Sequence, residues 1–140
     1  MIRYANKFDN KTIHNLLIDF HQKVPNHLSV DVSKWSATYV DSQLAKIYAG
    51  AGFVLIDDAG CGFLCAVKQP CFWIPETYTL QECMWHGKSK KIMLKLLAEY
   101  LKIGRQMLDK KEVLEVYFSS FSDVDYSKYG VKKIGNDWVM

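Results

Sequence analysis

The chain has 140 residues, a formal net charge of +3 and an apolar fraction of 49%, which is typical of one globular domain that buries its own core. No stretch is long and apolar enough to predict a membrane span, and the start MIRYANKF lacks the apolar core of a secretion signal. The mild charge favours a local anion site over a surface coated for nucleic acid. We therefore expect one domain over residues 1–140, in a cytoplasmic, reducing location.

Four cysteines, Cys61, Cys65, Cys71 and Cys83, lie in apolar runs and form no CxxC pair. Free cysteine in such runs behaves as a small buried hydrophobe. We therefore expect no metal site and no disulfide framework. A nucleophilic role for Cys83 is the alternative, and no neighbouring sequence signal supports it.

The first half of the chain predicts a short strand followed by two helices. Residues 2–5 are the strand candidate, and Asp9 is expected to cap a helix whose apolar residues recur every three or four positions. Ser33 is expected to cap the second helix, which ends at a glycine-rich turn over residues 50–52. Two helices therefore precede the main sheet.

The middle of the chain predicts three further strands. Residues 53–56 and 61–67 are apolar runs joined by an Asp-Asp-Ala-Gly turn, a pattern typical of an antiparallel hairpin. Residues 71–74 lie between two prolines and are predicted to be an edge strand or a packed loop. Residues 79–86 are the next strand, and Glu82 lies inside it.

Residues 88–111 predict the longest helix of the chain. The apolar residues recur at three- and four-residue spacing, so that one wide stripe should pack against the core. Eight of the 18 basic residues of the chain lie in this stretch, and they are densest in the first turn, where the helix dipole favours anions. The pattern predicts an anion site at the helix start. A solvated basic face is the alternative.

The remaining residues complete a mixed α/β (α+β) fold. Residues 113–119 predict a strand, residues 123–129 a short helical turn, and residues 131–134 and 138–140 a closing hairpin. The element order is β-α-α-β-β-β-α-β-α-β-β, in which the long helix makes the parallel crossover between the fourth and fifth strands. A ligand is expected at the carboxyl end of the fourth strand, where that helix begins.

Three stretches of the sequence resemble motifs of the GNAT N-acetyltransferase superfamily. TLQECMW at residues 79–85 resembles the fourth strand of its small members, including many encoded by phages. HGKSKK at residues 86–91 stands where the family has a loop that cradles the pyrophosphate of coenzyme A. YSKYGV at residues 126–131 resembles Y-x-x-x-G-F, whose Tyr often protonates the departing thiolate. The resemblance covers nearly the whole chain and implies acetyl-CoA as co-substrate.

The resemblance also implies roles for individual residues. Glu82, the sole carboxylate of an otherwise apolar strand, is the candidate base, and a solvated residue on the strand surface is the alternative. Tyr126 is the candidate acid, with Tyr129 as its competitor and simple aromatic packing as the alternative. Three backbone N–H groups would polarise the thioester carbonyl, those of Cys83, Met84 and Trp85. Five residues would hold the phosphates: Gly87, Lys88, Ser89, Lys90 and Lys91.

We therefore expect an acetyl-CoA-dependent N-acetyltransferase that acts on a primary amine of a small molecule or protein. The expectation includes no metal, no membrane and no nucleic acid partner, and it leaves a homodimer open. The alternative is a catalytically inactive GNAT-shaped protein with a structural or binding role. Its supporting feature is the phosphate loop, which holds one glycine, Gly87, where the family usually has two or three.

Overall fold

The computed structural model of the chain describes residues 1–23, 35–120 and 125–134. Within these ranges, five strands form one sheet in the order β1-β2-β3-β4-β5. β1 (Ile2–Tyr4), β2 (Gly52–Asp57), β3 (Gly62–Pro70) and β4 (Tyr78–Gly87) pair antiparallel, and β5 (Val116–Tyr117) pairs parallel with β4. The expected α/β fold with a mixed sheet is confirmed.

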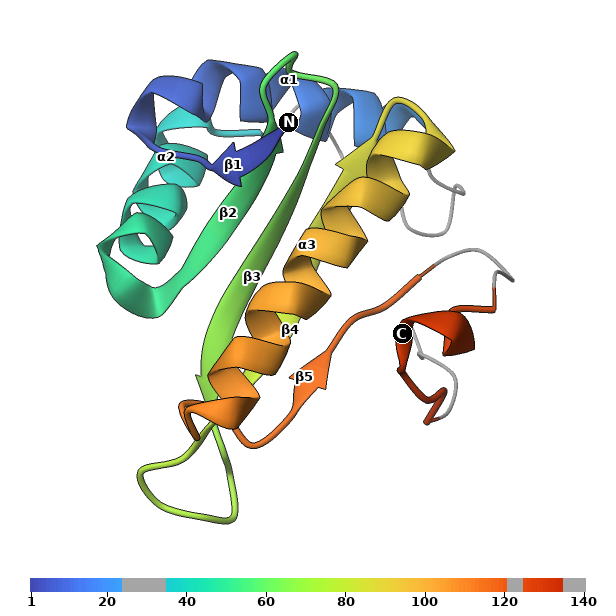
Figure 1. Ribbon diagram of the computed structural model, residues 1–140. Helices are drawn as coiled ribbons and strands as arrows, with labels where there is room; N and C mark the ends of the chain where they lie inside the picture. The colour runs from blue at the N-terminus through green and yellow to red at the C-terminus, as the bar shows by residue number, and fades with distance from the viewer. Residues whose placement is uncertain (24–34, 121–124, 135–140) are drawn as a thin grey trace.

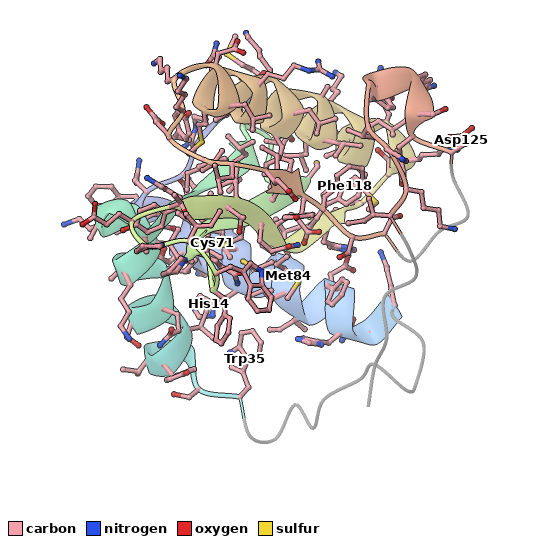
Figure 2. The ribbon with its side chains drawn as sticks, turned by 90° about the horizontal axis from the view of Figure 1, so that it is seen from below. His14, Trp35, Cys71, Met84, Phe118 and Asp125 are labelled. Carbon is pink, nitrogen blue, oxygen red and sulfur yellow. The ribbon has the colours of Figure 1, made fainter. Side chains whose placement is uncertain are left out.

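Helices cover both faces of this sheet. α1 (Asn10–Lys23) and α2 (Ala37–Lys46) lie on one face, and α3 (Lys90–Asp109) lies across the other (Figure 1). Figure 2 shows the same three layers from below, with the sheet between α3 and the α1 and α2 pair. None of the described helices is both long and apolar enough to cross a membrane. Three short helical turns complete the described elements: η1 (Lys7–Asp9), η4 (Ile47–Ala51) and η5 (Ser127–Tyr129).

Alternation along the strands gives the sheet two apolar cores. On β2, Leu55 contributes to the cluster on the α3 side, whereas its neighbours Val54 and Ile56 contribute to the cluster on the α1 side. Side chains of a strand point alternately to its two faces, so a sheet covered on both sides needs continuous apolar runs. Each fully buried side chain of this kind contributes about 1.5–3 kcal/mol.

The long helix begins and ends close to its predicted bounds. The Ser89 side chain caps α3 by accepting a hydrogen bond from the Ile92 N–H at 3.3 Å. The apolar stripe faces the core as expected, and its buried members are Leu96, Leu97, Tyr100, Leu101 and Ile103. Gly104 lets the helix approach β5, because a Cβ there would lie 2.9 Å from a methyl carbon of Val116.

The predicted helix caps differ from those of the structure. Asn6 rather than Asp9 begins the first helical segment, with its side chain accepting a hydrogen bond from the Phe8 N–H. Asp9 closes the capping box by accepting from the Asn6 N–H at 2.9 Å, so its role is reciprocal to the expected one. Ser33 lies outside the described residues, and Ser36 caps α2.

The strand predictions are confirmed in the centre of the sheet and wrong at its margins. β2 and β3 form the expected hairpin, and β4 matches its prediction within a residue. Residues 71–74 are neither an edge strand nor packed, since they lie in the loop between β3 and β4, where Phe72 and Trp73 are 89% and 82% exposed. β5 spans two residues instead of 113–119. Residues 131–134 form no strand, and residues 138–140 lie outside the described ranges.

Candidate active site

β4 and β5 separate immediately after they pair. Their partners in the parallel ladder are Leu80 with Val116 and Gln81 with Tyr117. The chain that follows β5 leaves the sheet edge (Figure 1). The backbone ladder between β4 and β5 therefore ends on the carboxyl side of both strands, and we call this place the opening of the sheet. A crossover fold of this kind binds its ligands at such a place.

A β-bulge lies on β4 beside this opening. In the ladder between β3 and β4, Cys65 is opposite Met84 and Ala66 is opposite Glu82, so Cys83 is an extra residue without a partner. A bulge locally disrupts the hydrogen-bonded ladder and increases the twist of the strand. The predicted N–H donors of residues 83–85 therefore begin at the point where β4 departs from regular pairing.

The bulge reverses which side chains face α3. Residues five positions apart on a regular strand point to opposite faces, yet Leu80 and Trp85 both belong to the cluster on the α3 side. Met84 packs on the opposite side, against the cluster under α1 (Figure 2). Trp85 donates a hydrogen bond from its indole N–H to the Met93 carbonyl at 3.1 Å, which fixes the end of β4 to the first turns of α3.

Glu82 is buried at the opening, with 8% of its surface exposed. Its carboxylate accepts a hydrogen bond from the Ser119 N–H at 3.0 Å, which fixes the position of the side chain at the end of the β4–β5 ladder. Burial, and then the nearby charge of Glu82, raise the pKa of Tyr100. Tyr100 donates its hydroxyl to the Tyr117 carbonyl. The solvated alternative for Glu82 is therefore wrong.

The aromatic residues on the other side of the opening include the candidate acid. Tyr126 lies just before η5, and its hydroxyl is 3.0 Å from the Ser120 hydroxyl. Its ring centroid lies 6.2 Å from that of Trp85 and 5.4 Å from that of Phe118. Phe118, labelled in Figure 2, was missed by the sequence analysis, because an aromatic in a strand looks like any core residue.

The two candidate catalytic side chains therefore contact consecutive residues. Glu82 binds the amide of Ser119, and Tyr126 meets the side chain of Ser120. Tyr129, the competitor for the acid role, lies 6.4 Å from Tyr126 between ring centroids. The structure thus brings both parts of the predicted site to the segment that follows β5.

The start of α3 presents positive charge to solvent. The side chains of Lys88, Lys90 and Lys91 are exposed, and the first turn carries no acidic residue. The N–H groups of Lys90 and Lys91 belong to the first turn, which has no acceptors within its own helix. Together with the dipole, these donors suit a phosphate group.

Three of the predicted phosphate residues also have structural tasks. Ser89 caps α3, as described above, and Lys88 and Gly87 have tasks of their own. The Lys88 N–H donates to the Cys61 carbonyl at 2.8 Å, so this amide is already used within the protein. Gly87 packs tightly under α3, since a Cβ there would lie 2.9 Å from the Met93 Cγ and 3.2 Å from the Met93 nitrogen. Replacing Gly87 would therefore disturb packing whether or not a phosphate binds there.

His86 forms a contact that the sequence analysis did not predict. Its Nε2 lies 2.6 Å from the Asp19 carboxylate of α1. The hydrogen bonds from His86 and then Lys23 lower the pKa of Asp19. The pair joins the end of β4 to α1 across 67 positions of sequence, and no local pattern points to so distant a partner.

Two cysteines on neighbouring strands are close together. The sulfur atoms of Cys65 and Cys83 lie 3.3 Å apart. Cys65 is buried as expected, whereas Cys83 is exposed, so the expectation of a buried thiol is wrong for Cys83. The reason is the bulge, which turns Cys83 out of the regular alternation. No cluster of three or more potential metal ligands occurs among the described residues.

The fold matches that of solved GNAT acetyltransferases. Glucosamine-6-phosphate N-acetyltransferase from Arabidopsis thaliana has a TM-score of 0.69 and 12% identity over 100% of this chain and 96% of that one. A GNAT family acetyltransferase from Staphylococcus aureus gives 0.62 and 14% over 100% and 96%. The ribosomal-protein-alanine N-acetyltransferase from Brucella melitensis biovar Abortus gives 0.63 and 12% over 100% and 96%. No family model and no curated protein matches the sequence. The likeness establishes a GNAT acetyltransferase fold.

Proposed function

We propose that the protein is an acetyl-CoA-dependent N-acetyltransferase with a single domain over residues 1–140. One observation carries the proposal: β4 and β5 separate beside the buried carboxylate of Glu82, and β4 leads from there to the basic start of α3. This arrangement offers a base and an anion site at the two ends of one strand segment. The acetyltransferases among the similar structures support the same reaction class.

The residues at the start of α3 fit the phosphates of acetyl-CoA. The first-turn N–H groups and the ammonium groups of Lys90 and Lys91 would bind them. From Gly87 back to Cys83, β4 covers about 13 Å at the usual rise of a strand, a distance that an extended pantetheine arm can span. The thioester would then meet the bulge at Cys83, where N–H donors could polarise its carbonyl.

Glu82 and Tyr126 would handle the protons. Glu82 would take a proton from the acceptor ammonium, directly or through water, while the hydrogen bond from the Ser119 N–H holds its carboxylate in place. The freed amine then attacks the thioester carbon, and the carbon–sulfur bond breaks. Tyr126 would donate its hydroxyl proton to the leaving thiolate, and the proton that the attacking nitrogen loses would restore the Tyr126 hydroxyl through water. The acceptor is a primary amine of a small molecule or a protein.

A binding protein without catalysis is the second candidate. The observation in its favour is the phosphate loop, where the Lys88 N–H is committed to Cys61 and Gly87 is needed for packing. Fewer backbone donors then remain for a pyrophosphate. The small phage-encoded type and a cytoplasmic location are further parts of the proposal that rest on the sequence alone, and the proposal leaves a homodimer open.

The test is a panel of amines and peptides incubated with acetyl-CoA, with release of free coenzyme A thiol as the readout. An acetylated product made by the wild type and lost in Glu82→Gln is the expected result. Binding of acetyl-CoA without product from any acceptor would contradict the catalytic proposal and favour the binding protein.

A further inference from the structure

We propose that Cys65 and Cys83 form a reversible disulfide when the protein meets a peroxide, and that this disulfide weakens acetyl-CoA binding. The first part stands on the geometry of the two thiols, and the second rests on the proposed function. The sulfur atoms lie 3.3 Å apart, and the Cys83 sulfur also lies 3.4 Å from the Cys65 carbonyl oxygen. A disulfide needs about 2.05 Å between its sulfurs, so a shift of roughly 1 Å would suffice.

The β-bulge in β4 is the reason why the sulfur atoms of Cys65 and Cys83 lie close together. Cys65 is opposite Met84 in the ladder, and Cys83 is the extra residue next to it. On a regular strand with Cys65 opposite Met84, residue 83 would point to the other face of the sheet. The inserted residue instead brings its side chain to the same side as Cys65, within reach of its sulfur.

The two thiols differ in access, which assigns them different roles. Cys83 is exposed and can meet a solute, whereas Cys65 is 5% exposed. The hydrogen bond with Cys83, and then burial, raise the pKa of Cys65. The same hydrogen bond lowers the pKa of Cys83, against the opposing effects of the partial burial of its sulfur and of the neighbouring Glu82 carboxylate. Cys83 is therefore the attacking thiolate and Cys65 the resolving thiol.

The reaction with hydrogen peroxide balances in two steps. The Cys83 thiolate attacks one peroxide oxygen, the O–O bond breaks, and the hydroxide that leaves is protonated to water, giving a sulfenic acid. The Cys65 sulfur then attacks the sulfenic sulfur, the S–O bond breaks, and the hydroxide leaves as water with the Cys65 proton. The two thiols have lost two electrons to the peroxide, and a dithiol reductant returns them.

The disulfide would act on the site through the bulge. Cys83 follows Glu82 directly and precedes the segment that would hold the thioester, so drawing Cys83 toward β3 displaces both. Coupling of this kind commonly changes affinity by about 5- to 150-fold, and it is reciprocal. Acetyl-CoA bound at the site should therefore shift the dithiol–disulfide equilibrium toward the two thiols by the same factor.

The test uses a Cys61→Ser, Cys71→Ser background, which retains only the pair. After treatment with hydrogen peroxide we expect the intact mass to fall by two hydrogens and maleimide labelling of both thiols to be lost. Peptide mapping should find the bond between residues 65 and 83, and dithiothreitol should reverse it. Calorimetry should show weaker acetyl-CoA binding in the oxidised form, and Cys65→Ser should not lose two hydrogens on treatment with peroxide, because Cys83 then has no resolving thiol.

Each other outcome has a definite meaning. Stable oxidation of Cys83 to sulfinic acid without the bond, or a bond between two chains, would overturn the proposal. A disulfide that leaves acetyl-CoA affinity unchanged would overturn its regulatory part. A disulfide in protein that binds no acetyl-CoA in either form would uphold the thiol chemistry and contradict the proposed function. If Cys65→Ser fails to fold, peptide mapping of the disulfide in the Cys61→Ser, Cys71→Ser protein decides whether the proposal holds.

Discussion

The carboxylate of Glu82 accepts a hydrogen bond from the backbone N–H of Ser119 at 3.0 Å. Glu82 lies one residue after the last pairing position of β4, and Ser119 lies two residues after that of β5. The Glu82 side chain thus connects β4 to the segment after β5 at the point where backbone pairing between the two strands ends. The candidate base and the opening of the sheet are therefore parts of one feature.

Glu82→Gln is expected to keep the fold and acetyl-CoA binding while lowering turnover by about 10²-fold or more. The amide oxygen of Gln can still accept from the Ser119 N–H, but the amide cannot take a proton at neutral pH. The measurement is the turnover rate as a function of pH, together with the melting temperature. Glu115→Gln is the control, because Glu115 precedes β5 and is exposed.

Wild-type turnover of Glu82→Gln at every pH would remove Glu82 from the chemistry. Loss of folding in this variant would show instead that the buried carboxylate is structural. In both cases the activity of the Glu115 control should equal that of the wild type.

Tyr126→Phe is expected to slow the chemical step by about 10²- to 10⁴-fold, the usual contribution of a general acid. The ring contacts with Trp85 and Phe118 remain, and the hydrogen bond to Ser120 is lost, so the melting temperature should change little. Single-turnover kinetics with the best acceptor measure the step. Tyr129→Phe is the matched variant, and a larger effect there would transfer the acid role to Tyr129.

Replacing Lys90 and Lys91 together by Glu should weaken acetyl-CoA binding by roughly 5- to 30-fold at low salt, as expected for two exposed charges worth about 1–2 kcal/mol. The effect should shrink as salt rises, because exposed charges are screened. Acidic residues suit the first turn of a helix, so weaker binding would not reflect a weaker α3. Titrations at several salt concentrations measure the effect.

The control for this pair is the double replacement of Lys102 and Lys110 by Glu, which makes the same change of charge at an exposed residue within α3 and at its C-cap. Equal loss of affinity in both double variants would indicate a general charge effect. Unchanged affinity in the Lys90 and Lys91 variant would place the phosphates elsewhere.

Asp19→Asn should lower the free energy of unfolding at pH 7 by about 1 kcal/mol. This is the usual contribution of a hydrogen bond to a charged group, reduced because Asp19 is partly exposed to solvent. The Asp19 side chain is 24% exposed, and its pKa is lowered from 3.8 by the hydrogen bonds of His86 and Lys23. A lowered pKa means that its stabilisation is present above the unfolded value and is lost as pH falls through the folded value. Denaturant unfolding from about pH 5 to pH 2 should therefore show the two proteins converging.

The difference in unfolding free energy between Asp19→Asn and the wild type could instead stay constant down to the lowest pH. That result would show that the ionised Asp19 carboxylate is not the source of the difference. Asp109→Asn is the control for loss of a carboxylate, since Asp109 is exposed at the end of α3. Its unfolding free energy should follow that of the wild type throughout.

Local patterns were sufficient for the centre of the fold. The stripe of α3 and the hairpin of β2 and β3 were predicted correctly, because helical periodicity and turn residues act over a few positions. The position of Glu82 inside a buried strand followed from the apolar residues around it. The basic start of α3 was visible as a run of lysines.

Local sequence patterns could not predict the bulge at Cys83 or the changes in side-chain orientation that follow from it. A bulge depends on the register between β3 and β4, and one inserted residue changes the face of every side chain that follows. The exposure of Cys83, its contact with Cys65 and the position of Trp85 all depend on that register. The contact between His86 and Asp19 likewise joins elements far apart in sequence. Capping by Asn6 was missed because Asp9 is an equally good cap by composition.

Calorimetric titration of the wild-type protein with acetyl-CoA tests the central claim most directly. The proposal predicts saturable binding, and at a hundredfold excess over the dissociation constant it predicts a stabilisation of about 2.7 kcal/mol with a matching rise in melting temperature. The same titration with peroxide-treated protein should give a lower affinity. No heat of binding and no rise in melting temperature at millimolar acetyl-CoA would contradict an acetyltransferase.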